Sequence, residues 1–235
     1  MNNIFLKDLF KSLEKDKVNY LVLRGYQNLP ESYSHDIDFS VINENELFSF
    51  FNVLHNLSKK YNYTISRDVV RLGLLKVFLH FGNEILKIDV FCSFSYGGLE
   101  YINIDDLHNS KRKSLSNISI PSLNYELAIS LLKELLHNSR IRKDKVFLLR
   151  SQYEKTTFDQ PFVKYFSKIY IDKISISLFL KDKLIFKKIA YFCRVNLLFG
   201  NLKSKGFLKT LNNMMIFTII KYYNKDKYDK FIIKK

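Results

Sequence analysis

The chain has 235 residues, 47% of them hydrophobic, and a formal net charge of +15. This length allows one large domain or two small ones with a buried core, and the composition excludes an intrinsically disordered protein. Two distant cysteines, Cys92 and Cys193, form no CxxC or Cys/His pattern, which argues against a zinc site or a disulfide framework. No secretion signal and no membrane-spanning apolar run is visible, so we expect a cytoplasmic protein.

The positive charge is distributed unevenly along the chain. Acidic and basic residues nearly balance up to about Arg140, and the surplus belongs to the last part of the sequence. This distribution fits an acidic partner for the C-terminal region. Lys, Asn, Ile, Phe and Tyr are abundant throughout, so the lysines equally fit an ordinary solvated surface.

The first half of the chain mixes helical and strand patterns. Apolar residues recur at the helical period in two segments, and Asn43 is suited to cap the second of them. The predicted elements are a helix at 4–16, strands at 20–23 and 36–42, a helix at 44–60, and strands at 63–71, 74–81 and 85–94.

This order predicts an α+β fold, in which a mixed sheet carries helices on one side and a mainly helical region follows. The predicted core spans residues 1–120, and the helical, basic region spans residues 121–235. The further elements predicted are a strand at 99–102, a helical turn from Asp105, and helices that begin at Ser122 and span 181–198 and 209–223.

Three aspartates lie on two of the predicted strands. Asp36 and Asp38 flank Ile37, and because successive side chains of a strand point to opposite faces, both carboxylates share one face. Asp89 stands in an apolar strand, where an unpaired carboxylate would be costly. Carboxylate oxygens are the ligands that Mg²⁺ prefers. The pattern therefore predicts a magnesium site.

Between Leu21 and Phe91 the sequence predicts five elements in order. They are a strand ending at Gly25, a loop, the strand with Asp36 and Asp38, a helix, and a later strand with Asp89. This arrangement resembles the minimal core of the nucleotidyltransferase superfamily related to DNA polymerase beta. A pair of aspartates at this spacing also occurs in glycosyltransferases, but those precede it with a longer nucleotide-binding region than this chain has.

The resemblance implies a fold, a reaction and roles for the three acids. Asp36 and Asp38 would hold magnesium on a nucleoside triphosphate, and Asp89 would bind a second ion or help to deprotonate the acceptor. The enzyme would transfer a nucleoside monophosphate to a hydroxyl or phosphate acceptor and release pyrophosphate. The chain also looks like uncharacterised bacterial members, some of which occur among surface-polysaccharide genes, and this suggests a small-molecule acceptor.

Five further residues are predicted to bind the nucleotide: Arg24, Gly25, Ser34, Lys76 and Lys87. The glycine would let the backbone approach the triphosphate, and the cations would reach phosphate oxygens. An ordinary salt bridge from Arg24 to the aspartates is the alternative. Tyr26 departs from the resemblance, because many members have Gly or Ser after the glycine. Either Ser32 or Ser34 of the following loop replaces that contact, or the phosphate cradle differs.

A second candidate segment lies after the helix that begins at Ser122. Leu136 to Arg140, followed by Arg142 and Lys143, is where the superfamily often places base or phosphate contacts. The alternative is a helix end at which cations complement the helix dipole.

From about Lys164 onward, lysines alternate with aromatic and aliphatic residues at helical spacing. This pattern fits three partners: the protein's own core, an anionic membrane surface, or the phosphates of a nucleic acid. No nucleic-acid motif supports the last, so a membrane-peripheral location is favoured over nucleic acid.

Two other functions remain open from the sequence. A degenerate nucleotidyltransferase fold could act as a binding or regulatory module, which Tyr26 favours and the three retained aspartates oppose. The second open function is a toxin-like enzyme that nucleotidylates tRNA or protein, in which the basic tail would bind tRNA.

Overall fold

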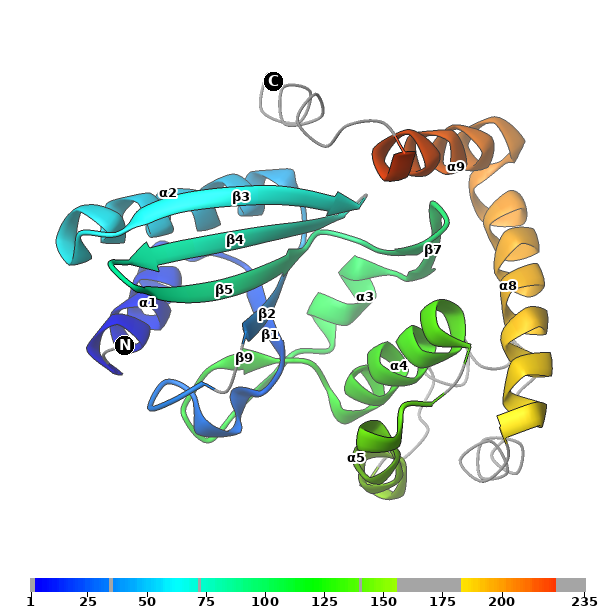
Figure 1. Cartoon of the computed structure of the whole chain (residues 1–235), viewed down its shortest axis with the longest axis horizontal. Helices are drawn as coiled ribbons and strands as arrows, with labels where there is room; N and C mark the ends of the chain where they lie inside the picture. Colours follow the sequence, from blue (N-terminus) through cyan, green and yellow to red (C-terminus); the bar gives the residue numbers. More distant parts are fainter. Residues whose placement is uncertain (1–2, 34–35, 72, 140, 156–182, 223–235) are drawn as a thin grey trace. The chain divides into compact units, whose positions relative to one another are not determined.

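The computed structural model describes residues 3–33, 36–71, 73–139, 141–155 and 183–222 (Figure 1). The chain divides into two compact units. The first comprises Met1–Phe94, Ile104–Pro121 and Phe217–Lys235, and the second comprises Ser95–Asn103 and Ser122–Ile216. The division predicted between residues 120 and 121 stays a prediction.

A five-stranded mixed sheet forms the centre of the first unit, in the order β1-β2-β5-β4-β3. The central strands β2 and β5 are parallel, and every other neighbouring pair is antiparallel. The strands are β1 (Tyr20–Arg24), β2 (Asp36–Val41), β3 (Thr64–Arg71), β4 (Leu74–Phe81) and β5 (Glu84–Phe91). The predicted α+β class with a mixed sheet is thereby confirmed.

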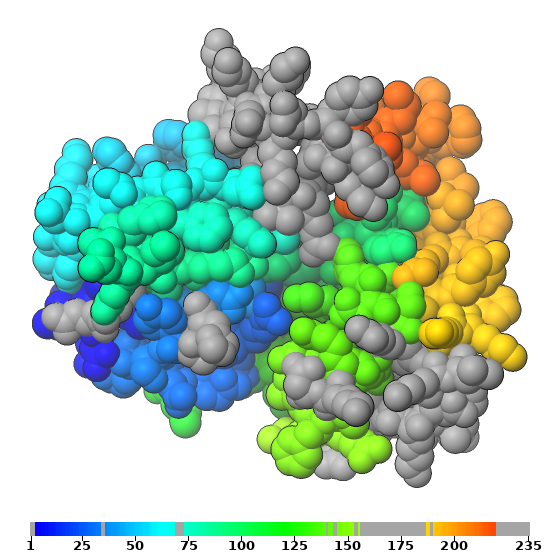
Figure 2. All heavy atoms as spheres, viewed as in Figure 1, coloured from blue at the N-terminus to red at the C-terminus, as the bar shows by residue number. Residues whose placement is uncertain are grey.

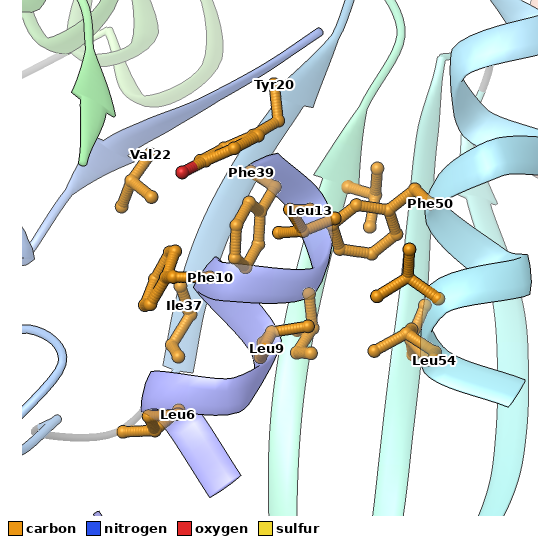
Figure 3. Packing of buried hydrophobic residues seen from close by; sticks show 14 of the residues in the cluster. Leu6, Leu9, Phe10, Leu13, Tyr20, Val22, Ile37, Phe39, Phe50 and Leu54 are labelled. Atoms are coloured by element: carbon orange, nitrogen blue, oxygen red, sulfur yellow. The ribbon is translucent and has the colours of Figure 1, made fainter. Parts of the chain in front are cut away.

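Helices α1 (Asn3–Lys15) and α2 (Glu44–Tyr61) supply the apolar cover of this sheet. Asn43 caps α2 as expected, because its side-chain oxygen accepts a 2.9 Å hydrogen bond from the Glu46 amide. Buried side chains of both helices surround Phe39 of β2 (Figure 3). The helices therefore cover the face that carries Ile37 and Phe39, and the alternate residues of β2 point the other way.

A short helix and a small ribbon also belong to the first unit. Helix α3 (Ile104–Asn109) precedes strands β8 (Arg112–Lys113) and β9 (Ser119–Ile120), which pair in antiparallel fashion. The helical turn expected from Asp105 corresponds to α3.

The second unit combines a hairpin with helices. Its elements are β6 (Phe94–Tyr96), β7 (Leu99–Ile102), α4 (Leu123–Lys133), a π-helical turn (Glu134–Asn138), α5 (Lys143–Lys155), α8 (Lys183–Lys205) and α9 (Phe207–Tyr222). The division between the units falls at the first residue of β6 and within α9, after Ile216. Asn201 ties α8 to β7, because its amide group exchanges two hydrogen bonds with the Glu100 backbone, of 3.1 and 2.9 Å. Among the residues described, no helix has both the length and the apolar character needed to cross a bilayer.

Candidate metal centre

The parallel pairing of β2 and β5 brings the three predicted aspartates together. Asp38 lies opposite Asp89 in register, and Asp36 lies opposite Lys87. One carboxylate oxygen from each aspartate lies within 4.8 Å of those of the other two. The cluster occupies the face of the sheet opposite to the one that α1 and α2 cover, because neighbouring residues of a strand alternate between faces.

Charged residues continue across the whole sheet at the level of Asp38. Residues directly opposite on paired strands share a face, so one row of charges runs from β1 to β3. Its members, in the order of the strands, are Arg24, Asp38, Asp89, Lys76 and Asp68. Like charges are adjacent only at Asp38 and Asp89, and this is where an added cation is stabilised most.

Two cations already contact the aspartates. The Lys87 ammonium lies 2.9 Å from Asp36 Oδ2 and 3.4 Å from Asp89 Oδ1, and Arg24 Nε donates to Asp38 Oδ2. Burial disfavours the charged ammonium, but the attraction of Asp36 and Asp89 outweighs it and raises the pKa of Lys87. Arg24 thus forms the salt bridge that was the alternative to phosphate contact, and Lys87 lies at the acids. Contact of either residue with a nucleotide stays a prediction.

The carboxylates are buried more deeply than their charges would suggest. Asp38 is 2% exposed and Asp89 is 7% exposed. Asp38 Oδ1 is a buried atom that accepts no hydrogen bond within the described structure, and the buried Asp89 Oδ1 has the Lys87 ammonium at 3.4 Å as its contact. Burial raises the pKa of Asp89, an effect that Lys87 opposes and Asp38 reinforces. Buried oxygens of this kind are costly without a partner, and a hard divalent cation is a partner suited to them.

Gly25 lies directly after β1 with a φ of 68°. This left-handed conformation explains the choice of glycine. A Cβ built on Gly25 would have no atom within 4 Å, so the space beside the backbone is open. The structure therefore leaves room at the position where close approach of a phosphate is predicted.

Tyr26, the residue that departs from the resemblance, is held inside the first unit. Its hydroxyl accepts a 3.1 Å hydrogen bond from Arg112 Nη2, and the Arg112 guanidinium lies 5.9 Å from the centre of its ring. Arg112 is itself fixed by a 3.0 Å bond from Nε to the Pro121 carbonyl. Tyr26 thus has a structural explanation that does not involve a ligand.

Of the remaining predicted residues, Lys76 lies beside Asp89 in register on β4, and Ser34 lies outside the described residues. In the second candidate segment, the His137 ring packs edge-on against Tyr96 at 5.2 Å, and Arg142 pairs with the buried Glu134 at 3.1 Å. Contact of these residues with a nucleotide stays a prediction, and Arg140 lies outside the described residues.

A buried polar contact beside the cluster was not predicted. Ser40 follows Asp38 on the same face of β2, and its hydroxyl lies 3.1 Å from His108 Nε2 of α3. His108 Nδ1 lies 3.2 Å from the Asn19 side-chain oxygen, and burial lowers the pKa of His108 to about 4. The ring is therefore neutral at physiological pH, with Nδ1–H donating and Nε2 accepting. The one sequence signal for this contact is the alternation along the strand, which places Ser40 on the same face as Asp38.

Comparisons with protein-family models, with curated proteins and with solved structures found no match to this chain. The geometry of the three aspartates and their neighbours is accordingly the basis for the function proposed below.

Proposed function

We propose that the three-aspartate cluster binds magnesium, and that the protein transfers a nucleoside monophosphate from a nucleoside triphosphate to a hydroxyl or phosphate acceptor. The observation that carries this proposal is the in-register pairing of Asp38 with Asp89, whose buried carboxylates each have an oxygen within 4.8 Å of one from Asp36. Interior carboxylates of like charge are set side by side when a cation holds them.

Asp36, Asp38 and Asp89 are the residues that would hold the metal. Bound magnesium would supply charge neutralisation at the attacking and leaving oxygens of an in-line displacement. An all-oxygen donor set matches the preference of Mg²⁺ and leaves coordination positions for water and phosphate.

The cations of the site are suited to the phosphates. Arg24 is exposed and Lys87 is half-buried, so both can reach a ligand above the sheet. Their N–H groups would bind phosphate oxygens, and the open space beside Gly25 would admit the phosphate chain. Asp89 is the carboxylate that would bind a second ion or help to deprotonate an acceptor hydroxyl.

One observation favours a second candidate, a non-catalytic binding module. Lys87 contacts Asp36 and Asp89, and Arg24 contacts Asp38, so the carboxylates have counter-ions without any metal. If these ion pairs are the final state of the site, the cluster stabilises the sheet and performs no chemistry. The two candidates differ in whether a divalent ion displaces the internal cations.

Pyrophosphate release separates the candidates. The purified chain is supplied with each common ribonucleoside triphosphate, with or without magnesium, together with sugar phosphates or polyols as acceptors. We expect magnesium-dependent release that Asp38→Asn abolishes and that Asp16→Asn, an exposed aspartate outside the cluster, leaves unchanged. Equal release by wild type and Asp38→Asn would reject the catalytic proposal.

We place the reaction in the cytoplasm. Cys92 and Cys193 are both free thiols, which suits a reducing compartment. A small sugar, polyol or phosphorylated molecule remains the proposed acceptor, and the polysaccharide association rests on the sequence resemblance alone.

A further inference from the structure

Helix α8 carries an exposed stripe that combines aromatic and basic residues. Phe192 is 59% exposed and Phe199 is 63% exposed, and their spacing of seven places both on one face of the helix. Lys188 and Lys203 are exposed four residues before and after the two rings, so they flank them on the same face. The stripe is therefore apolar at its centre and positive at both ends.

Helix α9 also exposes an apolar stripe. Leu208 is 79% exposed, and Leu211, Met215 and Ile219 follow on the same face with large exposed fractions. The buried Thr210 lies on the opposite side. An amphipathic helix of a globular protein normally buries its apolar stripe, so α9 exposes apolar residues that would ordinarily be covered. Side chains of both helices lie on the surface shown in Figure 2, coloured yellow to orange.

The charge of these two helices has a single sign. Between Lys183 and Tyr222 the sequence contains eight basic residues and no acidic one. Soluble monomers rarely expose several large apolar side chains together, and such surfaces mark contacts with proteins or membranes. A second copy of this chain would set two basic surfaces against each other, which like-charge repulsion opposes. A nucleic acid would neutralise the lysines but would leave the aliphatic residues of α9 in water.

We propose that α8 and α9 bind the surface of an anionic lipid bilayer. A membrane surface offers both features that the helices require, because negative headgroups attract the lysines and the acyl boundary receives the exposed rings and aliphatic side chains. The helices lie in the headgroup region and do not cross the membrane, in keeping with their composition. This attachment is independent of the metal centre, so its test does not depend on catalysis.

The absence of tryptophan makes a direct test possible. The chain contains no Trp, so Phe199→Trp introduces a single fluorescent reporter on α8. We expect its emission to shift to the blue when vesicles of mixed phosphatidylcholine and phosphatidylglycerol are added, because the indole leaves water. The matched control is Phe48→Trp on α2, where the ring is 68% exposed in a stretch without basic neighbours, and no shift is expected there.

Co-sedimentation with the same vesicles measures the contribution of each feature. We expect Phe192→Ser combined with Phe199→Ser to weaken partitioning by about tenfold or more, since two rings no longer enter the apolar boundary. Lys188→Glu combined with Lys203→Glu is expected to weaken binding to the anionic vesicles by a similar factor. It should leave the weaker association with pure phosphatidylcholine vesicles unchanged.

Three results would overturn the proposal. These are no sedimentation with anionic vesicles at low salt, equal blue shifts for the α8 and α2 reporters, and a blue shift of the α8 reporter without lipid that follows dimerisation in light scattering. The last result would assign the exposed stripes to a second copy of the chain.

Discussion

The two faces of the five-stranded sheet use the same strands in opposite ways. On β2, Ile37 and Phe39 point into the apolar core beneath α1 and α2, while Asp36 and Asp38 point to the other face. Adjacent residues of one strand thus belong to different environments. The face beneath α1 and α2 is stabilised by excluding water from apolar side chains. On the other face, burying charged carboxylates costs free energy, and counter-ions reduce that cost.

This difference between the faces predicts which substitutions affect stability and which affect metal binding. Changes on the covered face should lower the free energy of unfolding, and changes among the aspartates should alter metal affinity with little effect on the fold. The following predictions test that separation.

Phe39→Ala should have the largest effect. The ring is fully buried, and its centre lies 5.0 Å from that of Phe50 and 6.0 Å from those of Phe10 and Tyr20. Its removal leaves a cavity, so we expect a loss of about 3 to 5 kcal/mol in the free energy of unfolding, measured with urea. Phe48→Ala, at an exposed position, should change that free energy by less than about 0.5 kcal/mol. Similar losses for both would contradict the assigned core.

The second prediction concerns the buried His108 and the loss of stability when its ring is protonated. The pKa of His108 is lowered to about 4 in the folded chain, against an ordinary value of 6.5. The unfolded chain therefore binds the proton first as the pH falls, and stability should decrease between pH 6.5 and 4 by about 3 kcal/mol.

His108→Gln removes this titration and should flatten the acid side of the stability profile, followed by urea unfolding at each pH. His55→Gln alters an exposed histidine and should leave the wild-type slope in place. A wild-type slope in the His108 variant would assign the acid sensitivity to other groups.

Asp38→Asn tests the charged face directly. We expect affinity for Mn²⁺ or Mg²⁺, measured by calorimetry, to fall by about a hundredfold, equivalent to about 2.7 kcal/mol. The free energy of unfolding without metal should change by less than about 1 kcal/mol, because losing the Arg24 ion pair is offset by relieving the repulsion with Asp89. A large loss of stability with unchanged metal affinity would make the cluster a structural ion-pair network.

Lys87→Met should have the smallest effect and the opposite sign. The ammonium contacts two of the three carboxylates and therefore competes with a divalent ion for them. Its removal should raise metal affinity by about tenfold while lowering metal-free stability. Lys59→Met, an exposed lysine of α2, should change neither quantity. Unchanged affinity in the Lys87 variant would show that the lysine and the metal do not share the site.

Much of the fold follows from local patterns. The strand at 74–81 and the cap at Asn43 are properties of a few consecutive residues, and both occur in the structure as predicted. The order of the strands could not be predicted in this way, because the parallel pairing of β2 with β5 depends on residues far apart in the sequence. The strand expected at 85–94 ends at Phe91 instead, and a separate strand begins at Phe94.

The candidate site divides similarly. Alternation along β2 was enough to predict that Asp36 and Asp38 share a face, and a costly lone carboxylate was enough to single out Asp89. The internal counter-ion role of Lys87 depends on the register between strands, which no local pattern contains. His108 was missed because a histidine buried against Ser40 looks the same in a sequence as a histidine in water.

The parallel pairing of β2 and β5 also makes the site a reporter of folding. Asp36 and Lys87 are 51 residues apart in the chain, and α2, β3 and β4 lie between them. The three carboxylates meet only after this long segment has folded and the centre of the sheet has closed. A cation that binds all three carboxylates therefore binds the folded sheet and not the unfolded chain. The free energy of unfolding should accordingly rise with the concentration of that cation.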